Sequence, residues 1–138
     1  MIQLRINSEP VPKGRPRFSR HGHAYTPKKT RDYEESIKFA FLSQNCDSVP
    51  VYPKDIPLEV TVVFAKSVPK SYTKKRRAAC LNGEEAPTGK ADLDNYLKAV
   101  LDPLNGLAYE DDSQIVKTVA EKKYAEEPFI DITIRSLR

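Results

Sequence analysis

Residues 92–104 constrain the fold more than any other segment, because apolar side chains recur there at helical spacing. A helix of 3.6 residues per turn gathers these side chains into one stripe, and such a stripe has to be buried against another element. The apolar positions are Leu93, Tyr96, Leu97, Val100, Leu101 and Leu104. The sequence therefore predicts a helix over 92–104 that packs against a sheet or a second helix.

Three segments alternate apolar and polar side chains, which is the pattern of half-buried strands. They are residues 2–6, 58–65 and 129–135. A further strand is expected over 113–124, so the chain predicts an α+β fold with a small mixed sheet of about four strands backed by two or three helices.

The other two helices are predicted from their starts and their apolar spacing. Thr26 and Pro27 favour a helix over 27–44, with the threonine as N-cap and the proline at the first helical position. A short basic helix is expected over 71–81. Prolines and glycines over 10–26 favour a long basic loop. The length of 138 residues fits a single domain, 1–138.

The positive charge of the chain is concentrated in two runs. The net charge is +4, yet seven bases and no acid lie between Pro10 and Arg31, and a second basic run covers 70–77. Such runs indicate an anionic partner such as DNA, although a solvated helix face explains the second run equally well. The candidate DNA-binding residues are Lys13, Arg15, Arg17, Arg20, Lys28, Lys29, Lys74, Lys75 and Arg76.

Aromatic and imidazole side chains are interleaved with the first basic run. Phe18 and Tyr25 can stack on unpaired bases. His21 and His23 can do the same, although we favour a solvated loop for them. Carboxylates elsewhere already supply the oxygen ligands that hard cations prefer, so a histidine metal site is disfavoured.

Cysteine usage and hydropathy indicate a cytoplasmic protein without a membrane span. Cys46 and Cys80 lack the spacing of a metal site, and two distant cysteines fit a reducing compartment. The N-terminus lacks the apolar region of a signal peptide. No apolar run approaches the roughly 18 residues that a transmembrane helix needs.

Carboxylates gather at both ends of the 92–104 segment. Asp92 and Asp94 stand at the predicted helix start, where the helix dipole stabilises negative charge. Taken singly, these residues are ordinary, because an aspartate often caps a helix and Asp94 can pair with Lys98. Asp112 precedes a strand, however, and we expect that strand to bring it close to the other two. Three clustered carboxylates repel one another, and Mg²⁺ or Mn²⁺ relieves that repulsion.

The spacing of these residues resembles that of the RusA family of Holliday junction resolvases. The matching text is Asp92-Leu-Asp-Asn-Tyr-Leu-Lys98, then Asp102, Leu104-Asn-Gly106 and Asp111-Asp-Ser-Gln114. The segments Pro12-Lys-Gly-Arg-Pro-Arg17 and Tyr25-Thr26 also resemble family members. The likeness extends over most of the chain from Pro10 to Tyr124.

The resemblance implies a homodimeric, Mg²⁺-dependent endonuclease of DNA recombination and repair that cuts four-way junctions symmetrically, with Mn²⁺ as a substitute metal. Asp92, Asp94 and Asp112 match the metal-binding carboxylates of the family, and Lys98 matches its catalytic lysine. Asp102 and Asp111 match acidic positions without a fixed role.

Two alternatives stay open at this point. The same residues fit a metal-dependent nuclease that cuts flaps or single strands. They also fit a DNA-binding module without catalysis, in which the acidic residues are structural.

Overall fold

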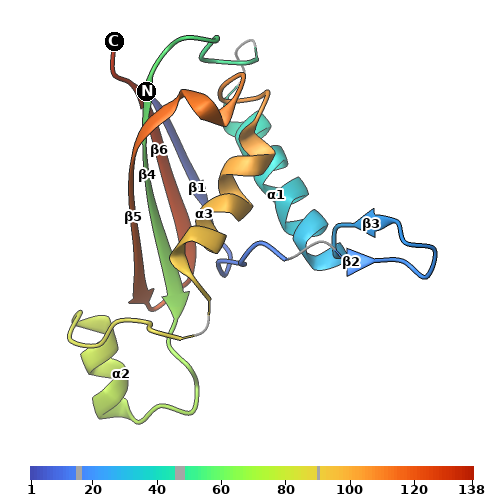
Figure 1. Ribbon diagram of the computed structural model, residues 1–138. Helices are drawn as coiled ribbons and strands as arrows, with labels where there is room; N and C mark the ends of the chain where they lie inside the picture. The colour runs from blue at the N-terminus through green and yellow to red at the C-terminus, as the bar shows by residue number, and fades with distance from the viewer. Residues whose placement is uncertain (15–16, 46–48, 90) are drawn as a thin grey trace.

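The protein is built around a four-stranded mixed sheet. The computed structural model describes residues 1–14, 17–45, 49–89 and 91–138. The strand order is β1 (Ile2–Ile6), β6 (Phe129–Ser136), β4 (Leu58–Ser67) and β5 (Ile115–Ala125). Strand β6 pairs antiparallel with both β1 and β4, whereas β4 and β5 are parallel (Figure 1). The predicted α+β fold is confirmed.

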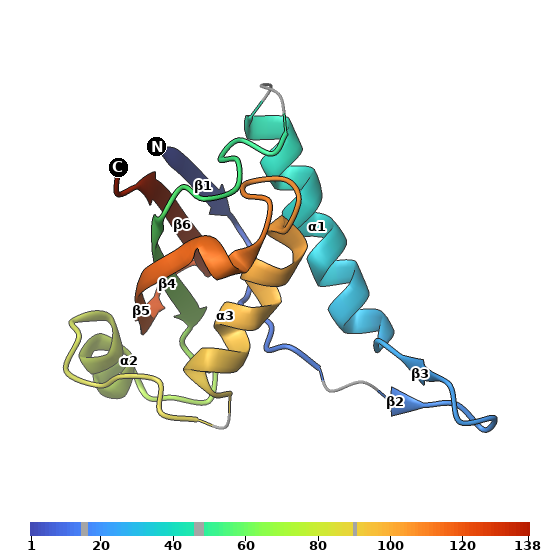
Figure 2. The ribbon, with the colours of Figure 1, turned by 45° about the horizontal axis from the view of Figure 1, so that its top comes forward.

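Two helices cover one face of this sheet. They are α1 (Lys28–Gln44) and α3 (Leu93–Leu101), which contact each other and lie on the same side of the strands (Figure 2). A third helix, α2 (Lys74–Leu81), lies beyond the C-terminal ends of β4 and β5. The core forms between the helices and the sheet, where the Tyr96 ring of α3 stacks on Phe64 of β4 at a centroid distance of 5.2 Å.

The alternating strands place every second side chain in this core. Leu58, Val60, Val62 and Phe64 of β4 are fully buried, whereas the residues between them are half-buried on the other face of the sheet. The segments predicted over 58–65 and 129–135 are therefore confirmed as strands, and each extends slightly further.

Two helix ends differ from the prediction. The proline at residue 27 occupies the N-cap position of α1 instead of the first helical position, and no side chain caps the helix, so the predicted Thr26 cap is wrong. The helix expected over 92–104 ends at Leu101 and continues as the 3₁₀ turn η1 (Asp102–Leu104). Pro103 lacks the N–H that another α-helical turn requires.

The predicted basic loop over 10–26 contains a small antiparallel arm. Strands β2 (Arg17–Phe18) and β3 (Ala24–Tyr25) pair with each other, and Gly22 adopts φ +80° in the turn between them, a conformation that favours glycine. Figure 2 shows the arm projecting past the start of α1. Phe18 is 73% exposed and Tyr25 50% exposed, so the arm carries two aromatic rings into solvent.

Candidate functional site

The N-terminal end of α3 presents two exposed carboxylates. Asp92 occupies the N-cap position without a side-chain capping hydrogen bond, and Asp94 lies in the first turn. Lys122 fixes this end of the helix to β5, because its Nζ donates to the Ala91 carbonyl at 3.0 Å. Both carboxylates therefore stand near the C-terminal half of β5, open to solvent.

Lys98 lies one turn further along α3 and is exposed. The i,i+4 ion pair with Asp94 that would make it an ordinary structural lysine is not formed. Within the described residues, neither side chain has a hydrogen-bond partner. Lys98 is therefore free to contact a substrate anion.

A second acidic group surrounds Tyr109 at the C-terminal end of α3. The Tyr109 hydroxyl is buried and donates to the Leu101 carbonyl at 2.6 Å. Burial raises the pKa of this phenol, and the nearby negative charges of Asp112, Asp102 and Asp111 raise it further. These three aspartates therefore share one neighbourhood, away from Asp92.

Asp111 has a structural role. It caps the 3₁₀ turn η2 (Asp112–Gln114): its Oδ2 accepts from the Ser113 N–H at 3.3 Å, and the Gln114 Oε1 accepts from the Asp111 N–H at 3.0 Å. Hydrogen bonds from Ser113 hold the pKa of the Asp111 carboxyl below its usual range. The buried Gln114 also donates to the carbonyls of Pro53 and Ile56, which anchors the turn to the loop before β4.

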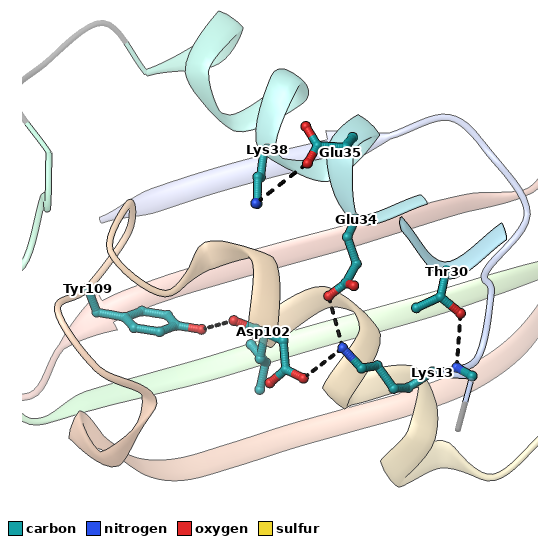
Figure 3. A network of polar contacts seen from close by, with 9 residues as sticks. Lys13, Thr30, Glu34, Glu35, Lys38, Asp102 and Tyr109 are labelled. Carbon is teal, nitrogen blue, oxygen red and sulfur yellow. Dashed lines mark hydrogen bonds and ion pairs between the residues drawn. The ribbon is translucent and has the colours of Figure 1, made fainter. Parts of the chain in front are cut away.

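Asp102 is likewise engaged, in the network of Figure 3. The Lys13 ammonium lies 3.1 Å from Asp102 Oδ2 and 3.0 Å from Glu34 Oε2, so one lysine joins the N-terminal segment to α1 and to the end of α3. Burial lowers the pKa of Lys13, but hydrogen bonds to Glu34 and Asp102 outweigh it and leave the pKa raised. The next residue, Gly14, packs closely against Thr30. A larger residue would not fit there, because an added Cβ would lie 2.5 Å from Thr30 Oγ1 and clash with it.

Asp112 differs from its two neighbours at this end. Its backbone N–H donates to Asn105 Oδ1 at 2.9 Å, but its exposed carboxylate has no hydrogen-bond or ion-pair partner among the described residues. The fold therefore sorts the acidic residues of the motif into two classes. Asp102 and Asp111 are bound by the protein itself, whereas Asp92, Asp94 and Asp112 are not.

The three free carboxylates do not meet within one chain, which corrects the expectation from the sequence. Helix α3 has nine residues and is therefore about 13 Å long, with Asp92 before its start and Asp112 beyond its far end, beside Asn105. The described parts of the chain contain no group of three or more Asp, Glu, His or Cys residues that could hold one metal ion. The prediction failed because the connection from η1 to β5 stays at the C-terminal end of α3.

The predicted DNA-binding residues also divide into engaged and free side chains. Lys13 has its two carboxylate partners, and Arg76 of α2 pairs with Glu85 at 2.7 Å while its guanidinium lies 3.6 Å over the Tyr72 ring. Five of the predicted bases are exposed without an ion-pair partner among the described residues: Arg20, Lys28, Lys29, Lys74 and Lys75. Arg15 and the Arg17 side chain lie outside the described residues.

The sequence analysis missed the structural roles of Gln114 and Lys13. The capping role of Gln114 could have been read from the spacing of Asp111 and Gln114, which resembles a capping box. The network of Lys13 has no such local signal, because its partners are distant in the sequence.

Cys80 is buried as a free thiol, and Cys46 lies outside the described residues.

Comparisons with known proteins identify the family of the chain. The model of the family described as "Endodeoxyribonuclease RusA" matches residues 7–135. The chain belongs to the RusA family of endodeoxyribonucleases. It is also 36% identical to the "Uncharacterized protein YqaN" of Bacillus subtilis (strain 168), over 99% of this chain and 96% of that protein.

Membrane-spanning helices are not part of the described structure. Each helix within the described ranges is too short or too polar to cross a bilayer.

Proposed function

We propose that this protein hydrolyses phosphodiester bonds in DNA and acts on four-way junctions as a homodimer. Membership of the RusA family supports endonuclease activity. One observation favours this function over a purely structural role for the acidic motif. The fold leaves Asp92, Asp94 and Asp112 exposed and without partners, and these are the same three residues that the resemblance assigns to catalysis.

Free carboxylates fit this role because the protein gains little from them structurally. A capping or paired aspartate stabilises its fold, as Asp111 and Asp102 do here. Asp92 makes no cap hydrogen bond although it occupies the cap position. Its carboxylate is therefore available to the reaction.

Lys98 supplies the positive charge of the proposed site. In phosphodiester hydrolysis, water attacks phosphorus, negative charge develops on the phosphoryl oxygens, and the bond to the leaving oxygen breaks. An ammonium group placed at those oxygens stabilises the developing charge. Lys98 is exposed on α3 and is not neutralised by Asp94, so it can make this contact.

The resemblance to the family implies a divalent metal, Mg²⁺ or Mn²⁺, but among the described residues of one chain no group of three or more possible ligands gathers for it. Mg²⁺ requires oxygens at about 2.1 Å, and carboxylates at opposite ends of α3 do not reach one ion.

The arm provides a surface for the DNA. Exposed bases on and beside it can contact phosphates, which fix the position of the DNA without reading its sequence. The two exposed rings, Phe18 and Tyr25, can stack on bases that are unpaired at the centre of a junction. Helix α2, which contains the exposed Lys74 and Lys75, lies beyond the same end of the sheet as the start of α3 and extends the basic surface there (Figure 1).

A panel of labelled DNA substrates tests the proposal. The parent chain is incubated with Mg²⁺ and a four-way junction, a flap, a single strand or a duplex. We expect paired cuts in the four-way junction. Cutting of flaps or single strands alone would show that the protein is a nuclease with a substrate other than the four-way junction. Binding without any cutting would favour the non-catalytic alternative.

A further inference from the structure

Lys122 of β5 ties the segment before α3 to the sheet through one hydrogen bond. Its Nζ donates to the Ala91 carbonyl at 3.0 Å, and Ala91 directly precedes Asp92. We infer that Lys122 is a positioning residue of the proposed reaction, which holds Asp92 and Asp94 in place through the backbone of Ala91. The inference rests on the proposed function, because it concerns the same carboxylates.

Lys122 reaches the helix from the face of the sheet that the helices cover. It pairs with Phe64 of β4, which is fully buried and stacks on the Tyr96 ring of α3. Residues paired across two strands share a face, so the lysine stem runs towards α3, which contacts β5 there (Figure 1). A partly buried ammonium is costly without a polar partner, and the Ala91 carbonyl supplies that partner.

The hydrogen bond to Ala91 constrains Asp92 because a peptide unit is rigid. The carbonyl of Ala91 and the N–H and Cα of Asp92 lie in one plane, so a bond that holds the carbonyl also restricts the Cα. Asp92 itself makes no side-chain cap hydrogen bond. Its carbonyl accepts from the Tyr96 N–H at 3.2 Å, which links the constraint to the first turn, where Asp94 lies. Lys122 therefore helps to set where both carboxylates stand.

Lys122 acts through the backbone and not by neutralising a carboxylate. Within the described ranges, no ion pair joins it to an acidic side chain. Lys117, on the same strand, instead pairs with Glu59 at 3.8 Å. A lysine that binds a carbonyl next to two unpaired aspartates is better explained by positioning them than by surface ion pairing.

Lys123 offers a matched control for Lys122. It is the next residue of β5 and carries the same charge, but successive side chains of a strand point to opposite faces. Its ammonium is exposed and lies 5.8 Å from the centre of the Phe129 ring. Loss of Lys123 therefore removes an equal charge without removing a contact to α3.

Cleavage kinetics on a four-way junction with Mg²⁺ test the positioning role. We expect kcat to fall about 10²-fold in Lys122→Met with KM nearly unchanged, because a reacting group displaced by about 1 Å loses that much rate. Lys123→Met should keep both parameters close to those of the parent. Equal losses in the two variants, or a loss confined to KM, would overturn the inference, because either result assigns Lys122 to DNA binding through its charge.

A conservative change tests whether the hydrogen bond is the cause. Lys122→Arg keeps a donor on a stem of similar length, so it should recover most of the lost kcat. An arginine variant as slow as Lys122→Met would contradict the inference. If Lys122→Met does not fold, Lys122→Gln takes its place, because its side chain is polar but too short to reach Ala91.

Amide hydrogen exchange, followed by NMR, measures the anchoring without DNA. The Tyr96 N–H reports on the first turn of α3, because it donates to Asp92. Its exchange should be about tenfold faster in Lys122→Met, since a hydrogen bond from a charged donor is lost, and unchanged in Lys123→Met. The Val62 amide in the central strand β4 is the reference. Equal acceleration at Tyr96 and Val62 would show general destabilisation and overturn the inference.

These measurements keep the two proposals distinct. If the parent cuts no DNA, the proposed function fails, and amide exchange still decides whether Lys122 anchors the start of α3. If the parent cuts DNA and Lys122→Met cuts it equally fast, the proposed function stands and the positioning role fails.

Discussion

The two ends of α3 carry similar numbers of acidic residues but use them differently. At the C-terminal end, Asp102 is held by Lys13 and Asp111 caps a 3₁₀ turn. At the N-terminal end, Asp92 and Asp94 have no partners among the described residues. Only Asp112 at the C-terminal end shares that property.

This difference teaches that acidity alone does not identify a catalytic residue. The sequence places all five aspartates in one motif, yet two of them stabilise the fold directly. A carboxylate that is exposed and unpaired beside a basic surface contributes little to stability. Its presence is then better explained by binding or chemistry, and the predictions below test that division.

The largest effect is expected for Asp94→Asn, which removes the charge and keeps the shape. We expect junction cleavage to fall about 10³-fold, because one of the carboxylates that the resemblance assigns to the divalent metal is lost, and such a metal contributes several kcal/mol of transition-state stabilisation. Stability should change by less than about 0.5 kcal/mol, since the side chain is exposed and unpaired. Labelled-junction cleavage and urea unfolding measure the two effects. Loss of folding together with activity would place Asp94 among the structural residues.

Lys98→Ala should have the next largest effect. We expect cleavage to slow about 10²-fold, because the ammonium no longer stabilises the developing phosphate charge. Junction affinity, measured by gel shift, should change little. Lys98→Arg serves as the control that keeps the charge, and it should recover part of the rate. Unchanged cleavage by the alanine variant would remove Lys98 from the reaction.

Lys13→Met tests whether the ion pairs at the C-terminal end of α3 stabilise the fold. It leaves Glu34 and Asp102 close together without their shared cation, so we expect a loss of about 1–3 kcal/mol in the free energy of unfolding. Lys38→Met is the matched control, because the ion pair of Lys38 with Glu35 is exposed and spans 3.7 Å, and its loss should cost under about 0.5 kcal/mol. Urea unfolding measures both free energies, and equal losses in the two variants would contradict the structural role assigned to Lys13.

The same lysine predicts a dependence on alkaline pH. Its folded pKa is raised, so its stabilisation is fully present below the unfolded value of about 10.4 and is lost as the pH rises through the folded pKa. The stability advantage of the parent over Lys13→Met should therefore shrink only at strongly alkaline pH. Unfolding curves at a series of pH values measure it, and an advantage that disappears near neutral pH would argue against the ion pair.

The smallest effect is expected from a single base near the arm. Lys29→Ala should reduce the slope of log affinity against log salt by about 0.9, which corresponds to one phosphate contact. Arg135→Ala is the control, because Arg135 pairs with Glu59 on the strands, away from the arm. An equal reduction in both variants would argue against a DNA surface at the arm.

Much of the fold could be predicted because local patterns decide it. The stripe of α3 and the alternation of β4 and β6 each give one buried face, and the structure uses both. The arm was missed because its paired strands have only two residues each, too few to show alternation. The order of the strands depends on long-range pairing that no local pattern records.

The candidate site was predicted residue by residue but not in space. The motif identifies Asp92, Asp94 and Asp112, and none of these three side chains has a hydrogen-bond or ion-pair partner in the part of the chain that the structure describes. Their expected meeting within one chain assumed that the strand beside α3 starts near the start of the helix. In the structure, the residues between Pro103 and Ile115 stay at the far end of the helix, so β5 starts there.

Adjacent aspartates allow the most direct test of the division into structural and catalytic carboxylates. Junction cleavage and urea unfolding are measured for Asp111→Ala and Asp112→Ala, which remove neighbouring carboxylates of the same charge. The account predicts a stable and inactive Asp112→Ala, and an Asp111→Ala that still cuts junctions but loses about 1 kcal/mol of stability with its cap. Full cleavage by Asp112→Ala would contradict the account.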